Sequence, residues 1–355
     1  MRKNTLKIAS ALALGGLLLS GCAPTQSTEP EGEVPAITTL RLGYFPNLTH
    51  AAALVGVAQG HFKTALKDLA ITVTPTIFNA GPDAVSALFG ESLDCSYIGP
   101  NPAINAYVQS KGEAIRVVAG ASSAGAALVV RDGINSVEDL VGKTLATPQL
   151  GNTQDVALRA WLLEQGVETT SEGGGDVAIR PQANAEGLAA FVSGTIDGAW
   201  VPQPWVAEYV AAGAKVLVDE KELWPNGEFV TTQIICRTSF IEDYPEVVTA
   251  LLKGHLAALD SIAADPEAAK QSFATGLAGI TGVSPKPEIL DQAWTDLKFT
   301  YDPIVNSLVK SAEDAVTVGL LDKAQIDAAG GLPGTLYDLA LLNKILVEQG
   351  KPEVK

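Results

Sequence analysis

Short runs of apolar and β-branched residues alternate with longer stretches of helical periodicity along the first part of the chain. Such runs are typical of strands buried on both faces, and the stretches between them predict helices that cover the sheet. The runs lie at residues 40–45, 71–78, 93–98, 115–119 and 126–131. This alternation favours parallel sheets with helices on both faces.

A second series of strands follows, and the chain then becomes helical. The later strands are predicted at residues 143–147, 177–180, 198–201 and 229–236. Helices are predicted at residues 245–264, 287–297, 303–318 and 336–349. We expect these C-terminal helices to pack around the first series of strands, because the strand at 229–236 returns the chain there.

Two segments, residues 93–102 and 195–204, repeat one pattern. In each, an aspartate, two small residues, an aromatic and a branched residue lead into a Pro-polar-Pro sequence. A second pair, residues 49–60 and 153–166, opens with threonine and closes with Gln-Gly. Strand-to-helix turns that recur in the same order predict two similar lobes, each directing helix N-termini into a shared cleft. Chance similarity between short α/β segments is the alternative.

The pattern therefore predicts an α/β fold of two lobes, each a helix-covered, mostly parallel sheet. Lobe 1 comprises residues 38–128 and 235–355, and lobe 2 comprises residues 129–234. The two crossings between the lobes, near 126–131 and 229–236, would form a hinge. A turn is expected at Ser122 and Ser123, just before the first crossing.

The N-terminus carries an export signal. Three basic residues precede an apolar run at residues 8–19, which is too short to span a bilayer as a permanent helix. The run ends in Leu-Ser-Gly-Cys22, which looks like a lipobox. We expect a signal peptide at 1–21, lipidation of Cys22, a flexible tether at 22–37 and an extracytoplasmic, membrane-anchored protein. An ordinary signal peptide with a stray cysteine is the alternative.

Charge and motif content exclude several classes of function. The formal net charge is −16, with 24 basic and 40 acidic residues, so a nucleic-acid partner is not expected. The three histidines, His50, His61 and His255, have no metal-ligand spacing. Dinucleotide, phosphate-loop and hydrolase motifs do not occur in the sequence. No metal and no cofactor is therefore expected.

Polar residues cluster at the predicted strand ends, where they could contact a ligand. Asn101 and Asn152 are also favoured N-cap residues, so capping is an alternative role for them. These loops contain no Lys or Arg, so an anion would be held by N–H groups, hydroxyls and helix termini. The candidate ligand-binding residues are Asn47, Thr49, His50, Gly99, Asn101, Ser122, Ser123, Asn152, Thr153, Gln154, Trp200 and Gln203.

Two cysteines, Cys95 and Cys236, lie within predicted strands. Export permits a disulfide between them. Buried free thiols are common in strands, so the sequence favours two free thiols and leaves the disulfide open.

Four motifs resemble those of ABC-importer solute-binding lipoproteins of the nitrate/sulfonate/taurine family. They are Gly-Tyr-Phe-Pro46, Asp94 with Gly-Pro-Asn-Pro102, Asp-Leu-x-Gly-Lys143, and Asp-Gly-Ala-Trp-x-Pro202. The resemblance implies a type II periplasmic-binding-protein-like fold, with a ligand closed between the lobes. It also implies a monomer that delivers its ligand to an ABC permease and its ATPase.

The ligands of that family include alkanesulfonates, taurine, nitrate and pyrimidine precursors of thiamine. The uncharged loops and the aromatic residues near them favour an aliphatic sulfonate, although no loop offers an acidic partner for the ammonium of taurine. Nitrate and an aminopyrimidine stacked between Trp200 and Tyr97 are alternatives. An enzyme on the same fold is a further alternative, for which His50 is the only candidate base.

Overall fold

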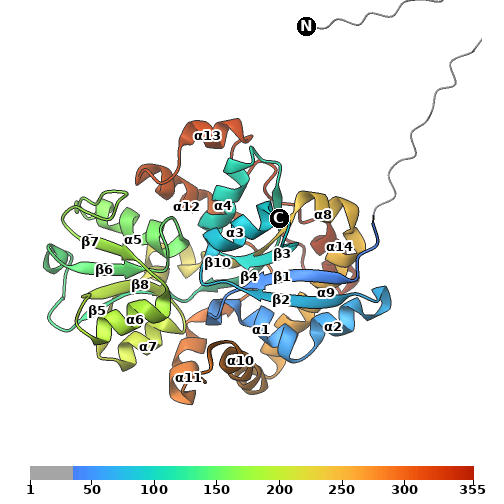
Figure 1. The fold of residues 1–355 in the computed structure, drawn as a ribbon, viewed down its shortest axis with the longest axis horizontal. Coiled ribbons are helices and arrows are strands. Elements are labelled where there is room, and N and C mark those ends of the chain that lie inside the picture. Colours follow the sequence, from blue (N-terminus) through green and yellow to red (C-terminus); the bar gives the residue numbers. More distant parts are fainter. Residues whose placement is uncertain (1–34) are drawn as a thin grey trace, which may run out of the picture. The chain divides into compact units, whose positions relative to one another are not determined.

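The computed structural model describes residues 35–355. The predicted signal peptide at 1–21, Cys22 and most of the tether lie outside the described residues. Residues 37–355 form one compact unit that contains two β-sheets (Figure 1).

The first sheet has six strands in the order β11-β4-β10-β3-β1-β2. Its parallel pairs are β1 with β2 and β1 with β3, whereas β10 runs antiparallel to both β3 and β4. The bounds are β1 Thr39–Tyr44, β2 Thr72–Ile77, β3 Cys95–Ile98, β4 Ile115–Ala124, β10 Val230–Arg237 and β11 Leu297–Phe299.

The second sheet has five strands in the order β7-β6-β8-β5-β9. Here β6 is parallel to β7 and β8, and β5 runs antiparallel to β8 and β9. The bounds are β5 Ala126–Arg131, β6 Thr144–Thr147, β7 Ala178–Pro181, β8 Gly198–Pro202 and β9 Ala214–Asp219. Both sheets are therefore mixed rather than mostly parallel, because the strands that cross between them return in the opposite direction.

The two sheets share one topology, which confirms the repeat. In each sheet one strand, β1 in the first and β6 in the second, lies between two parallel neighbours, and an antiparallel strand, β10 or β5, comes next. The repeated aspartates also act alike. Asp94 Oδ2 accepts from the backbone N–H of Arg41 at 2.8 Å, and Asp197 Oδ2 accepts from that of Thr144 at 2.8 Å. Asp94 thus fixes the loop before β3 to β1, and Asp197 fixes the loop before β8 to β6.

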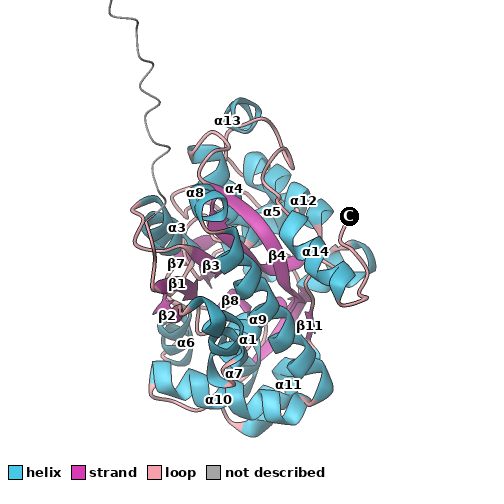
Figure 2. Ribbon diagram, turned by 90° about the vertical axis from the view of Figure 1, so that its right-hand side faces the viewer, coloured by secondary structure: helices cyan, strands magenta, loops and turns pink. Residues whose placement is uncertain are grey.

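Helices cover both faces of the first sheet. One face packs on α1 Ala51–Ala58, α2 His61–Leu66, α8 Thr238–Asp243, α9 Pro245–Ala264, α10 Pro266–Thr281 and α14 Ala340–Glu348. The other packs on α3 Gly81–Phe89, α4 Pro100–Gln109 and α12 Val305–Thr317, with α13 Lys323–Ala328 beyond α4. Figure 2 shows α9 and α14 beside the long strand β4.

The second sheet is covered by α5 Thr153–Glu164 on one face and by α6 Asn184–Val192 and α7 Trp205–Ala211 on the other. Short 3₁₀ helices connect the larger elements. They are η1 Leu48–His50, η2 Lys67–Leu69, η3 Glu138–Leu140, η4 Glu220–Leu223 and η5 Pro225–Gly227.

The sequence predicted that the C-terminal helices pack around the first series of strands. Two of them also pack against helices of the second sheet. The helix α11 Pro287–Thr295 packs against α7, and α12 packs against α5 as well as α4. The amphipathic pattern shows that these helices have an apolar face, but it does not identify the surface that covers this face.

The crossing between the sheets lies at Ala124 and Gly125, which join β4 to β5 with φ of 64° and 75°. The predicted turn at Ser122 and Ser123 is wrong, because both residues continue β4. The strand β5 lies wholly in the second sheet and β10 wholly in the first. The chain therefore changes sheet before residues 129 and 235, where the sequence placed the boundaries between the lobes. The division into two lobes remains a prediction.

Cys95 and Cys236 form a disulfide, so the expectation of free thiols is wrong. The two residues are register partners on the neighbouring antiparallel strands β3 and β10. This register depends on a return strand 141 positions away, which a local reading of the sequence could not place.

Among residues 35–355, α9 is the one helix long and apolar enough to cross a membrane. However, 61% of its most apolar window is buried inside the protein. Its side chains pack against α1 and α2, so α9 acts as a core helix.

Candidate functional site

A small polar cavity lies where strand ends and helix starts from both sheets meet. Its volume is about 20 Å³, enough for about one water molecule. The first sheet and its loops contribute Phe45, Asn47, Thr49, His50, Asn79, Gly99 and Thr231, and the second contributes Pro148, Asn152, Thr153, Gln154 and Pro202.

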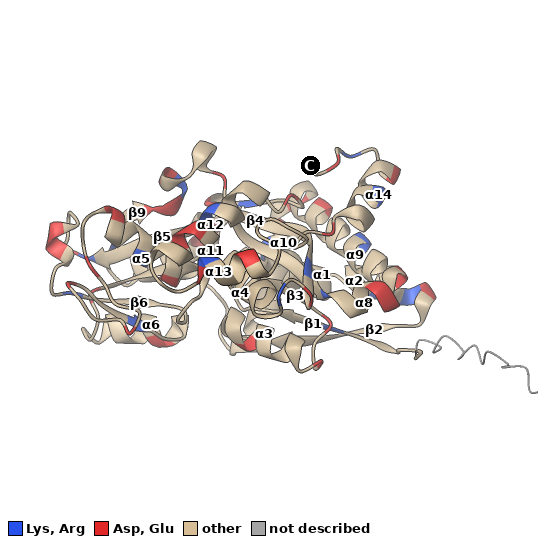
Figure 3. Ribbon diagram, turned by 90° about the horizontal axis from the view of Figure 1, so that it is seen from above, with Lys and Arg blue, Asp and Glu red and all other residues tan. Residues whose placement is uncertain are grey.

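Seven of the twelve candidate residues line this cavity. They are Asn47, Thr49, His50, Gly99, Asn152, Thr153 and Gln154. They come from three separate strand-to-helix turns, after β1, β3 and β6, which the fold brings together. No Lys, Arg, Asp or Glu lines the cavity, and Figure 3 shows charged positions along the outer helices and loops.

The N-terminus of α5 is held rigidly at the cavity. Asn152 Oδ1 accepts from the backbone N–H of Gln154 at 3.3 Å, so Asn152 caps this helix. The buried carboxylate of Asp155 accepts from Thr147 Oγ1 at 2.8 Å, from the Gly151 N–H at 3.0 Å and from Arg159 Nε at 3.1 Å. This network fixes the loop before α5 and thereby fixes the direction of its first-turn N–H groups.

Thr153 presents a polar group that is not satisfied within the protein. Its Oγ1 is buried and has no hydrogen-bond partner. The hydroxyl lies against the Cα of Gly99, where a Cβ would collide with it. Because a buried polar group without a partner is costly, Thr153 Oγ1 is a group whose hydrogen-bonding capacity a bound ligand could use.

His50 is neutral in this site. Its ring is buried, and this burial lowers the pKa of His50 to about 3. Nδ1 accepts from the backbone N–H of Phe45 at 3.3 Å, and the two rings lie 4.4 Å apart. The proton of the neutral imidazole is therefore on Nε2, which makes Nε2 a donor.

Two hydrogen bonds join the turns on either side of the cavity. The backbone N–H of Leu48 donates to the Gln203 carbonyl at 2.9 Å, and Trp205 Nε1 donates to Asn47 Oδ1 at 2.8 Å. The side chain of Gln203 faces away from the cavity, because its Nε2 donates to Asp296 Oδ2 at 2.7 Å. These two hydrogen bonds connect a turn of the first sheet with a turn of the second.

Three further candidate residues, Asn101, Ser122 and Ser123, do not line the cavity. Asn101 is not an N-cap, because α4 begins at Pro100 and the Asn101 Nδ2 donates to the Ser311 carbonyl at 3.1 Å. The hydroxyl of Ser122 donates to the Thr49 carbonyl at 2.8 Å. That of Ser123 accepts from the Phe229 N–H at 3.2 Å. The side chains of these three residues therefore bond to backbone groups of neighbouring elements.

Trp200 lies in the core of the second sheet rather than in the cavity. Its indole is fully buried, and Nε1 donates to Glu220 Oε2 at 2.6 Å. The ring packs on Trp161, with centroids 6.0 Å apart. The sequence could not distinguish an aromatic wall from core packing here, because both require an aromatic residue in a buried strand.

The sequence analysis missed Asn79 and Thr231 as cavity residues. Asn79 follows β2 just as Asn47 follows β1, and the two strands are parallel neighbours. Their carboxyl ends therefore meet at one edge of the sheet, so this rule could have identified Asn79. Thr231 lies on the antiparallel strand β10, to which the rule does not apply.

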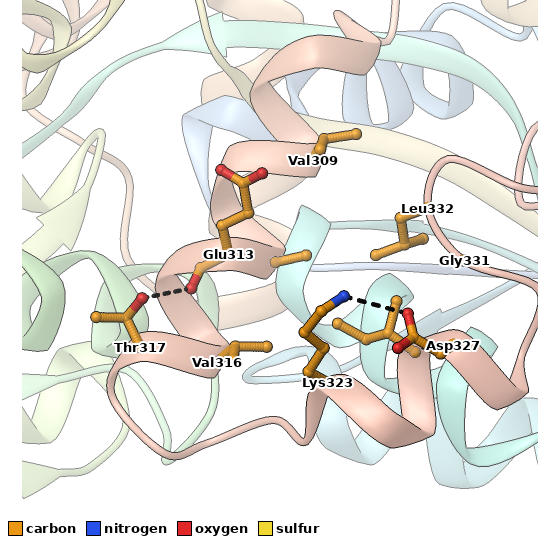
Figure 4. A pocket seen from close by; sticks show the side chains of 10 residues that line it. Val309, Glu313, Val316, Thr317, Lys323, Asp327, Gly331 and Leu332 are labelled. Atoms are coloured by element: carbon orange, nitrogen blue, oxygen red, sulfur yellow. Dashed lines mark hydrogen bonds and ion pairs between the residues drawn. The ribbon is translucent and has the colours of Figure 1, made fainter.

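A larger hollow lies between α12 and α13 (Figure 4). Its polar side chains bond within their own helices, since Lys323 Nζ donates to Asp327 Oδ1 at 3.2 Å and Thr317 Oγ1 to the Glu313 carbonyl at 2.8 Å. None of its side chains has a buried polar atom without a partner, unlike Thr153 in the cavity. In the part of the chain that the structure describes, no three His, Cys, Asp or Glu side chains are placed to hold a metal ion.

The family model described as "NMT1-like family" matches residues 33–278. The taurine-binding periplasmic protein of Escherichia coli K12 is 31% identical over 215 residues, which are 59% of this chain and 63% of that protein. A putative binding protein of Brucella abortus is 28% identical over 54% of this chain and 57% of its own length. The chain thus matches less than two thirds of each of these relatives.

Solved structures support the fold. The alkanesulfonate-binding protein SsuA of Xanthomonas axonopodis pv. citri, bound to MOPS, superposes with a TM-score of 0.69 at 18% identity, covering 83% of this chain and 98% of that one. The nitrate-binding protein NrtA of Synechocystis PCC 6803 gives 0.74 at 14% identity, covering 90% and 91%. The chain therefore has the periplasmic-binding-protein fold predicted from the sequence.

Proposed function

The chain belongs to the NMT1-like family, and from this premise we propose that it is the substrate-binding protein of an ABC importer and captures a small organic sulfonate. The cavity is lined by donors and small polar groups and carries no net charge. The observation on which the proposal depends most is the buried, unpartnered hydroxyl of Thr153 at the start of α5.

An anion can be held here without a fixed cation. Thr153 Oγ1, the Thr153 N–H and His50 Nε2 are donors on residues that line the cavity, whereas the N–H groups of the next three residues of α5 already donate to Asn152. A hydrogen bond to a charged group contributes about 1.5–3 kcal/mol, and a helix N-terminus adds up to about 1–2 kcal/mol. Three or four such contacts suffice for binding in the micromolar range, about −8 kcal/mol, after the cost of association.

An aminopyrimidine could not stack between Trp200 and Tyr97, because neither ring lines the cavity. Trp200 is enclosed in the second core, and Tyr97 is fully buried with its hydroxyl 2.8 Å from His255 Nδ1. An enzymatic role has little support, because His50 is the only cavity residue that could act as a base. At a pKa of about 3 its basicity is too weak for general-base catalysis near neutral pH.

The proposed mechanism is closure of two lobes about the Ala124–Gly125 connection. The ligand enters an open form, binds the donors of one lobe and is then enclosed by those of the other. The Trp205–Asn47 hydrogen bond would belong to the closed form, in which the cavity, here about the size of one water molecule, widens to admit the sulfonate head. A lipid on Cys22 would keep the protein at the outer face of the membrane, where it would deliver its ligand to an ABC permease and its ATPase.

The test is a calorimetric titration of the purified protein with methanesulfonate, taurine, nitrate and an aminopyrimidine. We expect the sulfonates to bind, and we expect Thr153→Val to weaken their binding about tenfold, since it removes one hydrogen bond to a charged group. The melting temperature without ligand should not fall, because the lost hydroxyl has no partner in the protein.

The matched control is Thr238→Val. Thr238 is also the first residue of a helix, and its Oγ1 is also buried without a partner, but it lies outside the cavity. Thr238→Val should leave sulfonate affinity unchanged. Equal effects of the two substitutions, or binding of nitrate or the aminopyrimidine alone, would refute the proposal.

A further inference from the structure

A second hollow adjoins the polar cavity and shares Asn47 and Asn79 with it. Its volume is about 380 Å³, within the range of small-molecule sites, whereas the polar cavity holds about 20 Å³. Like the cavity, it is lined from both sheets. A ligand head in the cavity would therefore have one large space beside it.

The walls of this hollow are mainly apolar. Leu188 of α6 and Trp205 of α7 come from the second sheet's helices, and Leu277 and Val283 come from the end of α10 and the loop after it. Val283 is 68% exposed, so the structure leaves a large apolar side chain uncovered at the rim. A bound apolar group would remove this surface from water.

The polar groups of the hollow disfavour a second anion. Glu208 is half-buried and lines the hollow, and its carboxylate would repel a negative charge there. Asn184 also lines it, and its Oδ1 is buried without a hydrogen-bond partner. An anionic oxygen could not satisfy this acceptor.

We propose that this hollow is the tail subsite of the ligand, and that the protein prefers sulfonates with a long or ring-bearing apolar tail that carries no second negative charge. This inference depends on the proposed function, because the sulfonate head must occupy the polar cavity. It assigns selectivity among sulfonates to Leu188, Trp205 and Val283, which contact the tail rather than the head.

The test is calorimetry with a series of linear 1-alkanesulfonates from methane to octane. Affinity should rise by up to about fourfold for each methylene that enters the hollow. An alkane-1,ω-disulfonate should bind at least tenfold more weakly than the monosulfonate of the same length. Val283→Ser should reduce the ratio of octane- to methanesulfonate affinity by about two- to threefold, and Leu188→Ala by more.

The matched control is Val192→Ser. Val192 is 66% exposed and lies on α6, outside the hollow, so its substitution should not change the affinity ratio. Methanesulfonate binding with no dependence on chain length would overturn the tail subsite and leave the proposed function standing. Failure of every sulfonate to bind would overturn both.

Discussion

The indole Nε1 of Trp205 donates a 2.8 Å hydrogen bond to Asn47 Oδ1, across the boundary between the two sheets. Asn47 follows β1 of the first sheet, and Trp205 begins α7, the helix after β8 of the second. The bond lies between the polar cavity and the apolar hollow, because Asn47 lines both. The proposed closure would therefore make and break this hydrogen bond between the two lining residues.

Trp205→Phe should weaken ligand binding about fivefold, because it keeps the ring but removes the donor that favours the closed form. Calorimetry with a sulfonate that binds the wild type measures the effect. The control is Trp161→Phe, since Trp161 packs on Trp200 in the core of the second sheet, outside the cavity. If both variants bind like the wild type, the Trp205–Asn47 bond does not stabilise the closed form.

Gly99→Ala should hinder closure by a steric effect. A Cβ on Gly99 would collide with Thr153 Oγ1 across the cavity, whereas the backbone of Gly99, at φ −73°, accepts alanine without strain. We expect sulfonate affinity to fall at least tenfold, with little change in the unfolding free energy measured in urea without ligand.

Gly279→Ala is the matched control for this variant. Gly279 lies in α10 with no atom within 4 Å of the added Cβ, so alanine should leave binding unchanged and stabilise the helix slightly. A Gly99→Ala protein that binds sulfonate normally would show that the lobes do not close against each other here.

The fold could be predicted from the sequence largely because local signals agree with it. The bounds of β5 and α9 match the predicted ranges, since an apolar run marks β5 and a proline starts α9. The strand β9 and the helix α10 were missed. The run at Ala214–Asp219 includes two charged residues, and α10 follows α9 with only Asp265 between them.

The lining of the polar cavity was predicted where it depends on the repeat and missed where it depends on tertiary register. Asn152 and Thr153 follow a strand-to-helix turn, and the structure places them at the cavity. Asn101 follows a similar turn, but α4 begins one residue before it, so its side chain lies against α12 instead. A shift of one residue at a helix start turns a side chain away by about 100°.

The Cys95–Cys236 disulfide should stabilise the protein substantially. It joins neighbouring strands of the first sheet and closes a long loop, with 141 positions between the cysteines. Reduction should lower the unfolding free energy by about 2–4 kcal/mol, mainly through a less restricted unfolded state. Urea unfolding with and without a reductant measures this difference.

The control for reduction is the Cys95→Ala/Cys236→Ala double variant, which should have the lower stability in both conditions. A wild-type protein whose unfolding midpoint does not respond to full reduction would contradict the prediction. A double variant that still responds to the reductant would show that the effect comes from elsewhere.

Glu220 should make stability depend on pH in the opposite direction from most carboxylates. Burial raises the pKa of Glu220 to about 7, although its hydrogen bond from Trp200 favours the charged form. Between about pH 4.5 and 7, Glu220 is therefore protonated in the folded state and ionised in the unfolded state. Stability from this group is present below that window and is lost as the pH rises through it.

Glu220→Gln should remove this dependence, because the amide keeps an acceptor for Trp200 Nε1 and cannot ionise. Denaturant unfolding at several pH values should show the wild type losing about 1–3 kcal/mol relative to the variant between pH 4.5 and 8. Glu222→Gln, an exposed neighbour in η4, should behave like the wild type. Parallel curves for the wild type and Glu220→Gln would mean that the buried carboxylate does not titrate in this range.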